Sequence, residues 1–249
     1  MSGHSKWSSI KHKKGAADAK RGKLFTKLSK GIQVAAREGG GDPIGNPALA
    51  LAIQRARDAS MPKDNIERAV AKGTGADADA AAIEHVVYEG YGPGGVAVLV
   101  DALTDNRNRT GSEVRYMFSS SGGGLGEPGS VAWNFEKKGV VVVDAARHQE
   151  EELMVAIDAG AEDVVTEADL FEIVTEPAAF AEVREALENA GVQLESAELT
   201  MRPSNRVEVT EAELGALLAL LETLEDHDDV SAVHANFEAD EELLERAVV

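Results

Sequence analysis

The spacing of apolar residues changes near residue 80, and this change limits the chain to a helical part followed by a mixed part. Before it, apolar side chains recur at helical intervals, at Leu24, Phe25, Leu28, Ile32 and Ala35. After the linker-like segment GTGADADAAA at 73–82, the run GVAVLVDAL at 95–103 predicts a strand that is buried on both faces. The sequence therefore predicts an α+β protein with its helical domain first.

Three helices are expected before the linker. The first spans about residues 17–37, and Gly39–Gly41 separates it from the second. Asn46 and Pro47 are an N-cap and a first helical residue, which predicts a helix to Ala59. Pro62 begins a third helix that Gly73 ends. These segments predict a small three-helix bundle, and residues 1–16, which lack the pattern, are expected to form an irregular extension.

The remaining chain alternates between strand and helix patterns. VAWNF at 131–135 and GVVVVD at 139–144 predict strands, and helices are expected at 107–120, 149–160, 177–190 and 211–225. Leu153 and Ile157 are expected to face inward on the second of these helices. Residues 172–199 and 207–233 share a strand, Val-Thr-Glu, an amphipathic helix and a strand at an offset of 35 residues. This weak repeat indicates ferredoxin-like α+β modules and leaves open which strands pair.

Charge divides the chain in the same place. The formal net charge is −19, yet residues 1–75 carry +9 and the remainder −28. A basic region on an acidic protein is typical of an arm that binds a polyanion. The acidic remainder needs no explanation beyond solubility.

The basic region is the first candidate nucleic-acid site. Its proposed contacts are Lys6, Trp7, Lys11, His12, Lys13, Lys14, Lys20, Arg21, Lys23, Lys27 and Lys30. Such cations bind phosphates with release of counterions, and Trp7 could stack on an unpaired base. Alternatively, the lysines form a solvated helix face, Trp7 folds onto the bundle, or the segment is an organellar targeting peptide. We favour polyanion binding for the cluster and leave Trp7 open.

A second candidate lies in TDNRNRTGSEVRYMF at 104–118. Asp105 or Asn106 can cap a helix whose positive end lies beside Arg107 and Arg109, with Arg115 further along. Amide donors and guanidinium groups together suit a phosphate or carboxylate. It is equally consistent with the sequence that these arginines neutralise nearby acids.

Other motifs carry no chemistry. GYGPGG at 90–95 matches a dinucleotide fingerprint but precedes a strand, which indicates a hairpin turn. The six histidines are scattered, and EDHDD at 225–229 could weakly attract a cation but is more simply a helix-ending acidic loop. The chain lacks cysteine, and neither a nucleophile, an acid–base pair nor a metal motif is evident. We therefore expect no enzyme activity, no metal and no cofactor.

The sequence also bounds the cellular setting. No apolar stretch approaches the roughly 20 residues that span a bilayer, and the N-terminus lacks a secretory core. We expect a cytoplasmic monomer that has no membrane partner.

Several stretches resemble the YebC family, whose mitochondrial members are translational activators. The similarity is carried by GHSKWSSIKHKKGAADAKRGKLFTKL, NPALALAIQRARDASMPKDNIERAVAKG, YEGYGPGGVAVLVDALTDNRNRT and GSVAWNFEKKG. It extends through the less distinctive C-terminal half and so covers essentially the entire chain.

The resemblance implies three domains. A helical domain at 1–78 would precede a ferredoxin-like α+β domain at 79–135 and 206–249, into which a second such domain at 136–205 is inserted. It also implies a cytoplasmic regulator that binds DNA, or a ribosome-associated translation factor that relieves stalling at proline runs. The charge pattern alone predicts only a polyanion partner, and docking of the basic end onto an acidic protein remains a third possibility.

Overall fold

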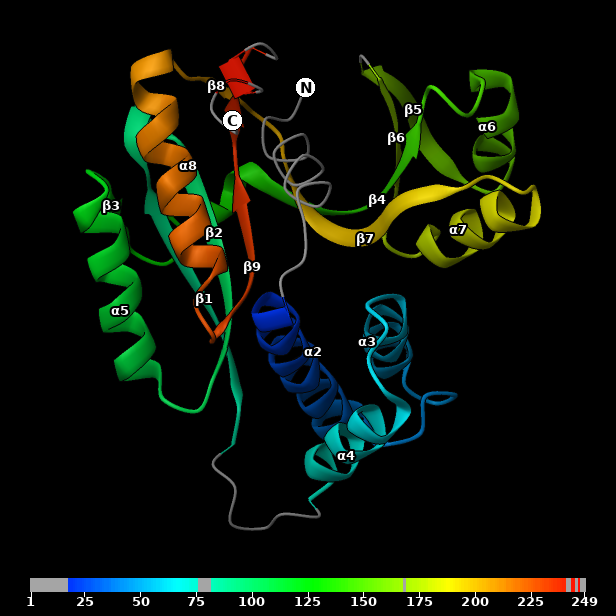
Figure 1. The fold of residues 1–249 in the computed structure, drawn as a ribbon, viewed down its shortest axis with the longest axis horizontal. Helices are drawn as coiled ribbons and strands as arrows, with labels where there is room; N and C mark the ends of the chain where they lie inside the picture. The colour runs from blue at the N-terminus through cyan, green and yellow to red at the C-terminus, as the bar shows by residue number, and fades with distance from the viewer. Residues whose placement is uncertain (1–17, 76–81, 168, 241–242, 245, 247–249) are drawn as a thin grey trace. The chain divides into compact units, whose positions relative to one another are not determined.

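The computed structural model describes residues 18–75, 82–167, 169–240, 243–244 and 246 (Figure 1). Its first elements are the helices α2 (Asp18–Gly39), α3 (Pro47–Asp58) and α4 (Lys63–Gly73). Ile32, Leu49, Ile53 and Ile66 are buried between them. The three helices expected from the apolar spacing are confirmed, although Leu24, at the start of the predicted stripe, is 45% exposed.

Local sequence explains where these helices begin and how closely they pack. The side chain of Asn46 accepts a hydrogen bond from the amide of Leu49 at 3.1 Å, as the Asn-Pro pair predicts for an N-cap. Gly73 is the last residue of α4, where a Cβ atom would lie 2.5 Å from the carbonyl oxygen of Gln33. Glycine therefore allows α4 to approach α2 closely as well as ending the helix.

Contacts divide the described residues into two compact units, of which one comprises residues 133–206 and the other the remainder. In the larger unit, an antiparallel sheet follows the helices. It contains β1 (Glu84–Tyr91), β2 (Ala97–Thr104), the short β3 (Gly124–Leu125) and β9 (Val230–Ala235), in the order β3-β1-β2-β9. GYGPGG joins β1 to β2 as the predicted hairpin, through a short 3₁₀ turn η1 (Pro93–Gly95).

Two helices cover one face of this sheet (Figure 1). They are α5 (Arg107–Ser120) and α8 (Glu211–Glu225). Val114 and Phe118 of α5 and the leucines of α8 pack against alternate valines of β2, such as Val98 and Val100. The predicted helices at 107–120 and 211–225 are confirmed, whereas the segment RVEVT contains only the two-residue strand β8 (Val207–Glu208). It pairs in parallel with β10 (Phe237–Glu238) rather than with the main sheet.

The smaller unit is a second antiparallel sheet with two helices. Its elements are β4 (Phe135–Asp144), α6 (Glu150–Asp158), β5 (Ala161–Glu167), β6 (Leu170–Thr175), α7 (Phe180–Asn189) and β7 (Leu194–Pro203). The strand order is β5-β6-β4-β7, which is the βαββαβ arrangement of a ferredoxin-like module. The α+β class is thereby confirmed, and the division into three domains stays a prediction.

Two local expectations were wrong. VAWNF is not a strand: Ala132–Asn134 forms a 3₁₀ turn, η2, and β4 begins at Phe135. The reason is tertiary, because the amides of Val131 and Ala132 donate to the buried carboxylate of Glu89 at 2.8 Å and hold the chain in a loop. On α6, Leu153 faces the core as predicted, but Ile157 lies outward, and Ala156 takes the inward position instead.

Candidate nucleic-acid interface

Three predicted contact residues on α2 lie on one face of the helix and reach the end of α8. Lys23 Nζ donates to the carbonyl oxygen of Asp226 at 3.2 Å, and Lys27 Nζ donates to that of Glu225. Lys30 Nζ donates to the carbonyl oxygen of Asp228 at 3.0 Å. Spacings of four and three residues place the three ammonium groups in one row. We call Lys23, Lys27 and Lys30 the lysine row.

Two members of the lysine row, Lys23 and Lys27, donate to carbonyl oxygens at the C-terminal end of α8. The last carbonyl groups of α8 have no partners within the helix and carry the negative end of its dipole. Amino groups placed there are favourable both as donors and as cations. Burial lowers the pKa of Lys27, and the neighbouring Asp226, Glu225 and Asp228 partly offset this effect.

Asp229 is the buried centre of this contact. Its Oδ1 accepts from Lys30 Nζ at 2.6 Å, and its Oδ2 accepts from Arg109 at 2.7 Å and from the Thr110 hydroxyl at 2.7 Å. Burial alone would raise the pKa of Asp229, but the hydrogen bonds from Lys30, Arg109 and Thr110 outweigh it and hold the pKa well below its usual range. Lys30 and Arg109, both predicted site residues, are thus brought together by a carboxylate.

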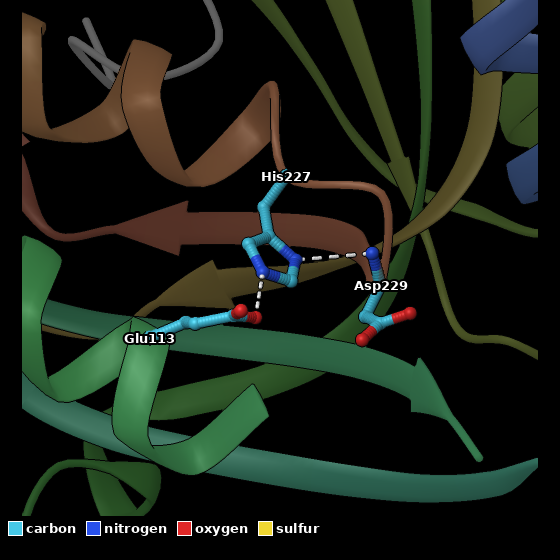
Figure 2. Close-up of side chains that lie close together, drawn as sticks. All are labelled: Glu113, His227 and Asp229. Atoms are coloured by element: carbon cyan, nitrogen blue, oxygen red, sulfur yellow. Dashed lines mark hydrogen bonds and ion pairs between the residues drawn. The ribbon is translucent and has the colours of Figure 1, made fainter. Parts of the chain in front are cut away.

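Figure 2 shows the side chains that border this centre. His227 Nδ1 accepts from the amide of Asp229 at 3.0 Å, so the proton lies on Nε2, which is 2.8 Å from the Glu113 carboxylate. Ligand atoms of Glu113, His227 and Asp229 lie within 4.8 Å of one another, as a metal ion requires. However, Asp229 is already neutralised by Lys30 and Arg109, so this group stabilises the turn after α8 and is poorly suited to a cation.

A second aspartate with a depressed pKa, half-buried, lies on the sheet. Asp101 of β2 contacts His85 Nε2 at 2.8 Å and His234 Nε2 at 3.3 Å. Burial alone would raise the pKa of Asp101, but the hydrogen bonds from the two histidines outweigh this effect and hold the pKa well below its usual range. His234, which the sequence places opposite Val233 and Ala235, therefore has a structural partner.

Among the described residues, the other arginines of α5 are exposed and form no hydrogen bond to Asp229. Asn106 caps the helix, as expected, by accepting from the amide of Arg109 at 3.1 Å. Arg107 and Arg115 are exposed, and neither forms an ion pair with a residue that the structure describes. The exposed Tyr116 lies next to Arg115. The three arginines predicted as one contact thus separate into one that is held by Asp229 and two that face solvent.

The remaining predicted contacts belong to the N-terminal part of the basic region. The positions Lys6, Trp7, Lys11, His12, Lys13 and Lys14 lie outside the described residues. Lys20 belongs to α2, but its side chain is not among those described, and Arg21 is exposed.

Sequence reasoning missed the role of the segment 225–229. The pattern of EDHDD predicts an acidic helix end, which is correct, but it does not predict that this segment contacts α2. The available signal was the opposite charge of the two segments, and about 200 residues separate them in the chain.

Comparison with known proteins decides the family. A family model described as the TACO1/YebC protein N-terminal domain matches residues 5–76, and one described as the TACO1/YebC second and third domain matches residues 83–237. The chain belongs to the TACO1/YebC family. The resemblance expected from the sequence is therefore confirmed.

Members of the TACO1/YebC family are similar to this chain over its length. A probable transcriptional regulatory protein from Rubrobacter xylanophilus is 58% identical over 245 residues, which cover 98% of both chains. Another so named, from Desulfotalea psychrophila, is 57% identical and covers 99% of both. The crystal structure of a conserved hypothetical protein from Aquifex aeolicus aligns with a TM-score of 0.81 at 49% identity, over 90% of this chain and 93% of that one.

A helix that spans a bilayer needs about 20 consecutive, mainly apolar residues. Among the described residues, none of the helices combines the length and the apolar character that a membrane span needs.

Proposed function

We propose that this chain is a non-enzymatic regulator of gene expression that binds nucleic acid through its basic N-terminal region. The observation that carries the proposal is the charge division, +9 in residues 1–75 against −28 in the remainder. Cations at this density bind phosphate backbones without base readout. The names of the relatives support a role in transcription, and DNA is therefore the first partner to test.

The proposed contacts fall into two groups. The N-terminal group contains Lys6, Trp7, Lys11, His12, Lys13, Lys14, Lys20 and Arg21. The second is the exposed pair Arg107 and Arg115 on α5. The lysine row and Arg109 can bind phosphate fully only if their hydrogen bonds to residues 225–229 are broken.

The alternative is a ribosome-associated translation factor that binds RNA. A specific observation favours it, because α4 is poorly equipped to read a DNA groove. Lys63 pairs with Glu67 at 3.5 Å, and Arg68 bonds to the side chain of Asn65 and the carbonyl oxygen of Asp64. A lysine-rich segment with Trp and His is also typical of arms that order on structured RNA.

Crosslinking in cells, followed by sequencing of the attached nucleic acid, separates the two. Enrichment of promoter DNA supports the transcriptional role, whereas ribosomal RNA supports the translational one. Recovery of neither above the background of an untagged strain contradicts the proposal.

The salt dependence of binding tests the contacts themselves. Replacing Lys11, Lys13 and Lys14 by Ala should reduce the slope of log K against log salt by up to about three units, because each phosphate contact releases about one counterion. Replacing Arg107 and Arg115 by Gln should reduce it by up to about two units on the same basis. Fluorescence anisotropy with a labelled duplex and a labelled single strand measures both slopes. An unchanged slope shows that the replaced residues do not contact phosphate.

A further inference from the structure

Two members of the lysine row, Lys27 and Lys30, are partly covered by an acidic segment of the protein, whereas Lys23 is exposed. Each of its ammonium groups donates to a polar atom of residues 225–229, and the side chain of Lys30 is only 19% exposed. Lys27 is half-buried. In this arrangement, a phosphate could not reach Lys27 or Lys30 without displacing their partners.

The covering segment resembles a polyanion in its chemistry. Within five residues, EDHDD supplies three carbonyl oxygens to the lysine row, a buried carboxylate from Asp229, and nearby charge from Glu225, Asp226 and Asp228. The lysines are about 4.5–6 Å apart along the helix axis, from the rise of 1.5 Å per residue. The segment thus presents one acceptor oxygen to each of three ammonium groups in a row, as a phosphate backbone can.

We infer that residues 225–229 compete with nucleic acid for the lysine row, so that full binding requires α2 to separate from the end of α8. This inference rests on the proposed function and adds a regulatory contact to it. The N-terminal lysines would make the first contacts. The lysine row would follow only when the polyanion outcompetes the protein's own acids, which biases binding against weak or short polyanions.

A purely structural role for the lysine row predicts something different. In that case α2 stays on the end of α8 in the bound state, and the acids of EDHDD influence binding only through the net charge. Two measurements separate these roles.

The first measurement is a distance. The chain has no cysteine, so Glu38→Cys on α2 and Glu222→Cys on α8, both exposed, allow specific spin labelling. Double electron–electron resonance then measures the distance between the two labels in the protein alone, with oligouridine, and with a mixed-sequence DNA duplex. Competition predicts a longer label-to-label distance at saturation with the probe that binds. An unchanged distance at saturation overturns the inference.

The second measurement compares two charge-matched variants. Asp226→Asn with Asp228→Asn removes two exposed acids beside the lysine row and leaves Asp229 in place. The control, Glu127→Gln with Glu208→Gln, removes two exposed acids elsewhere in the same unit. We expect the first variant to bind the same probe about fivefold more tightly than the control at low salt. Equal affinities overturn the inference.

The outcomes for the proposed function are distinct. If the wild-type chain binds none of the probes and no crosslinked nucleic acid is recovered in cells, the proposed function fails and this inference fails with it. If the chain binds with unchanged distances and equal affinities, only the competition is wrong.

Discussion

The cations of α2 and those of α5 are alike in the sequence but face different surroundings in the structure. Both helices reach Asp229, α2 through Lys30 and α5 through Arg109. The ammonium groups of the lysine row of α2 donate hydrogen bonds to carbonyl oxygens of the protein, whereas Arg107 and Arg115 of α5 face solvent. A lysine or arginine in the sequence therefore does not show that its charge is available to a ligand, because an acidic segment distant in the chain can already bind that side chain.

The largest expected effect comes from the residue that the two helices share. Asp229→Asn removes the charge that holds Lys30, Arg109 and Thr110, and should lower the free energy of unfolding by about 2–3 kcal/mol, since breaking a buried ion pair leaves its partners uncompensated. Urea unfolding monitored by circular dichroism measures the change. The matched control is Asp105→Asn, an exposed partner of the same Arg109, which should unfold like the wild type. Equal losses in the two variants would mean that Asp229 is not the centre of the contact.

The contribution of Asp229 to the free energy of unfolding should also depend on pH in the acid range. Because the pKa of Asp229 is depressed in the folded chain, its contribution is complete above the ordinary Asp pKa of about 4 and is lost as the pH falls below it. The difference between wild type and Asp229→Asn should thus be constant near neutral pH and shrink on acidification. The pKa of Asp101 is also depressed, by His85 and His234. Asp101 therefore adds to the acid sensitivity of both proteins, and its effect cancels in the difference between them. A difference that persists unchanged into strong acid contradicts the assignment.

A smaller effect is expected from the lysine row itself. Replacing Lys23, Lys27 and Lys30 by Gln removes the cations from the end of α8, and should cost about 1–2 kcal/mol of unfolding free energy, mainly through Lys27 and Lys30. The measurement is again urea unfolding, with hydrogen exchange of the last turn of α8 as a local readout.

The smallest effect is expected on α5. Replacing Arg107 and Arg115 by Gln should leave the unfolding midpoint unchanged, because neither side chain has an ion-pair partner among the described residues. Loss of stability in this pair, or none in the lysine variant, would reverse the comparison between the two helices.

Much of the local structure could be predicted. The leucine pattern predicts α8 at 211–225, and Asn46-Pro47 predicts the start of α3, because caps and apolar periodicity act within a few residues. The strand predicted at VAWNF does not form, because a long-range contact decides the structure there. There the buried carboxylate of Glu89, more than 40 residues earlier, binds the amides of a short apolar run and prevents a strand.

The two strand–helix–strand repeats show the same limit. Both exist as local patterns, but β6 and β7 flank β4, whereas β8 pairs with β10 and leaves β9 to join β2. Similar local patterns can form different sheets, because strand pairing depends on long-range contacts that the repeat does not contain.

By itself, the sequence determined the family, the α+β class, the helical start of the fold and the opposite charges of its two parts. Only the tertiary structure decided which cations are exposed. The reason is physical: composition sets how many charges a chain carries, but a lysine is masked or available according to which carboxylate or carbonyl group the fold brings to it. For Lys30 that group is Asp229, 199 residues away.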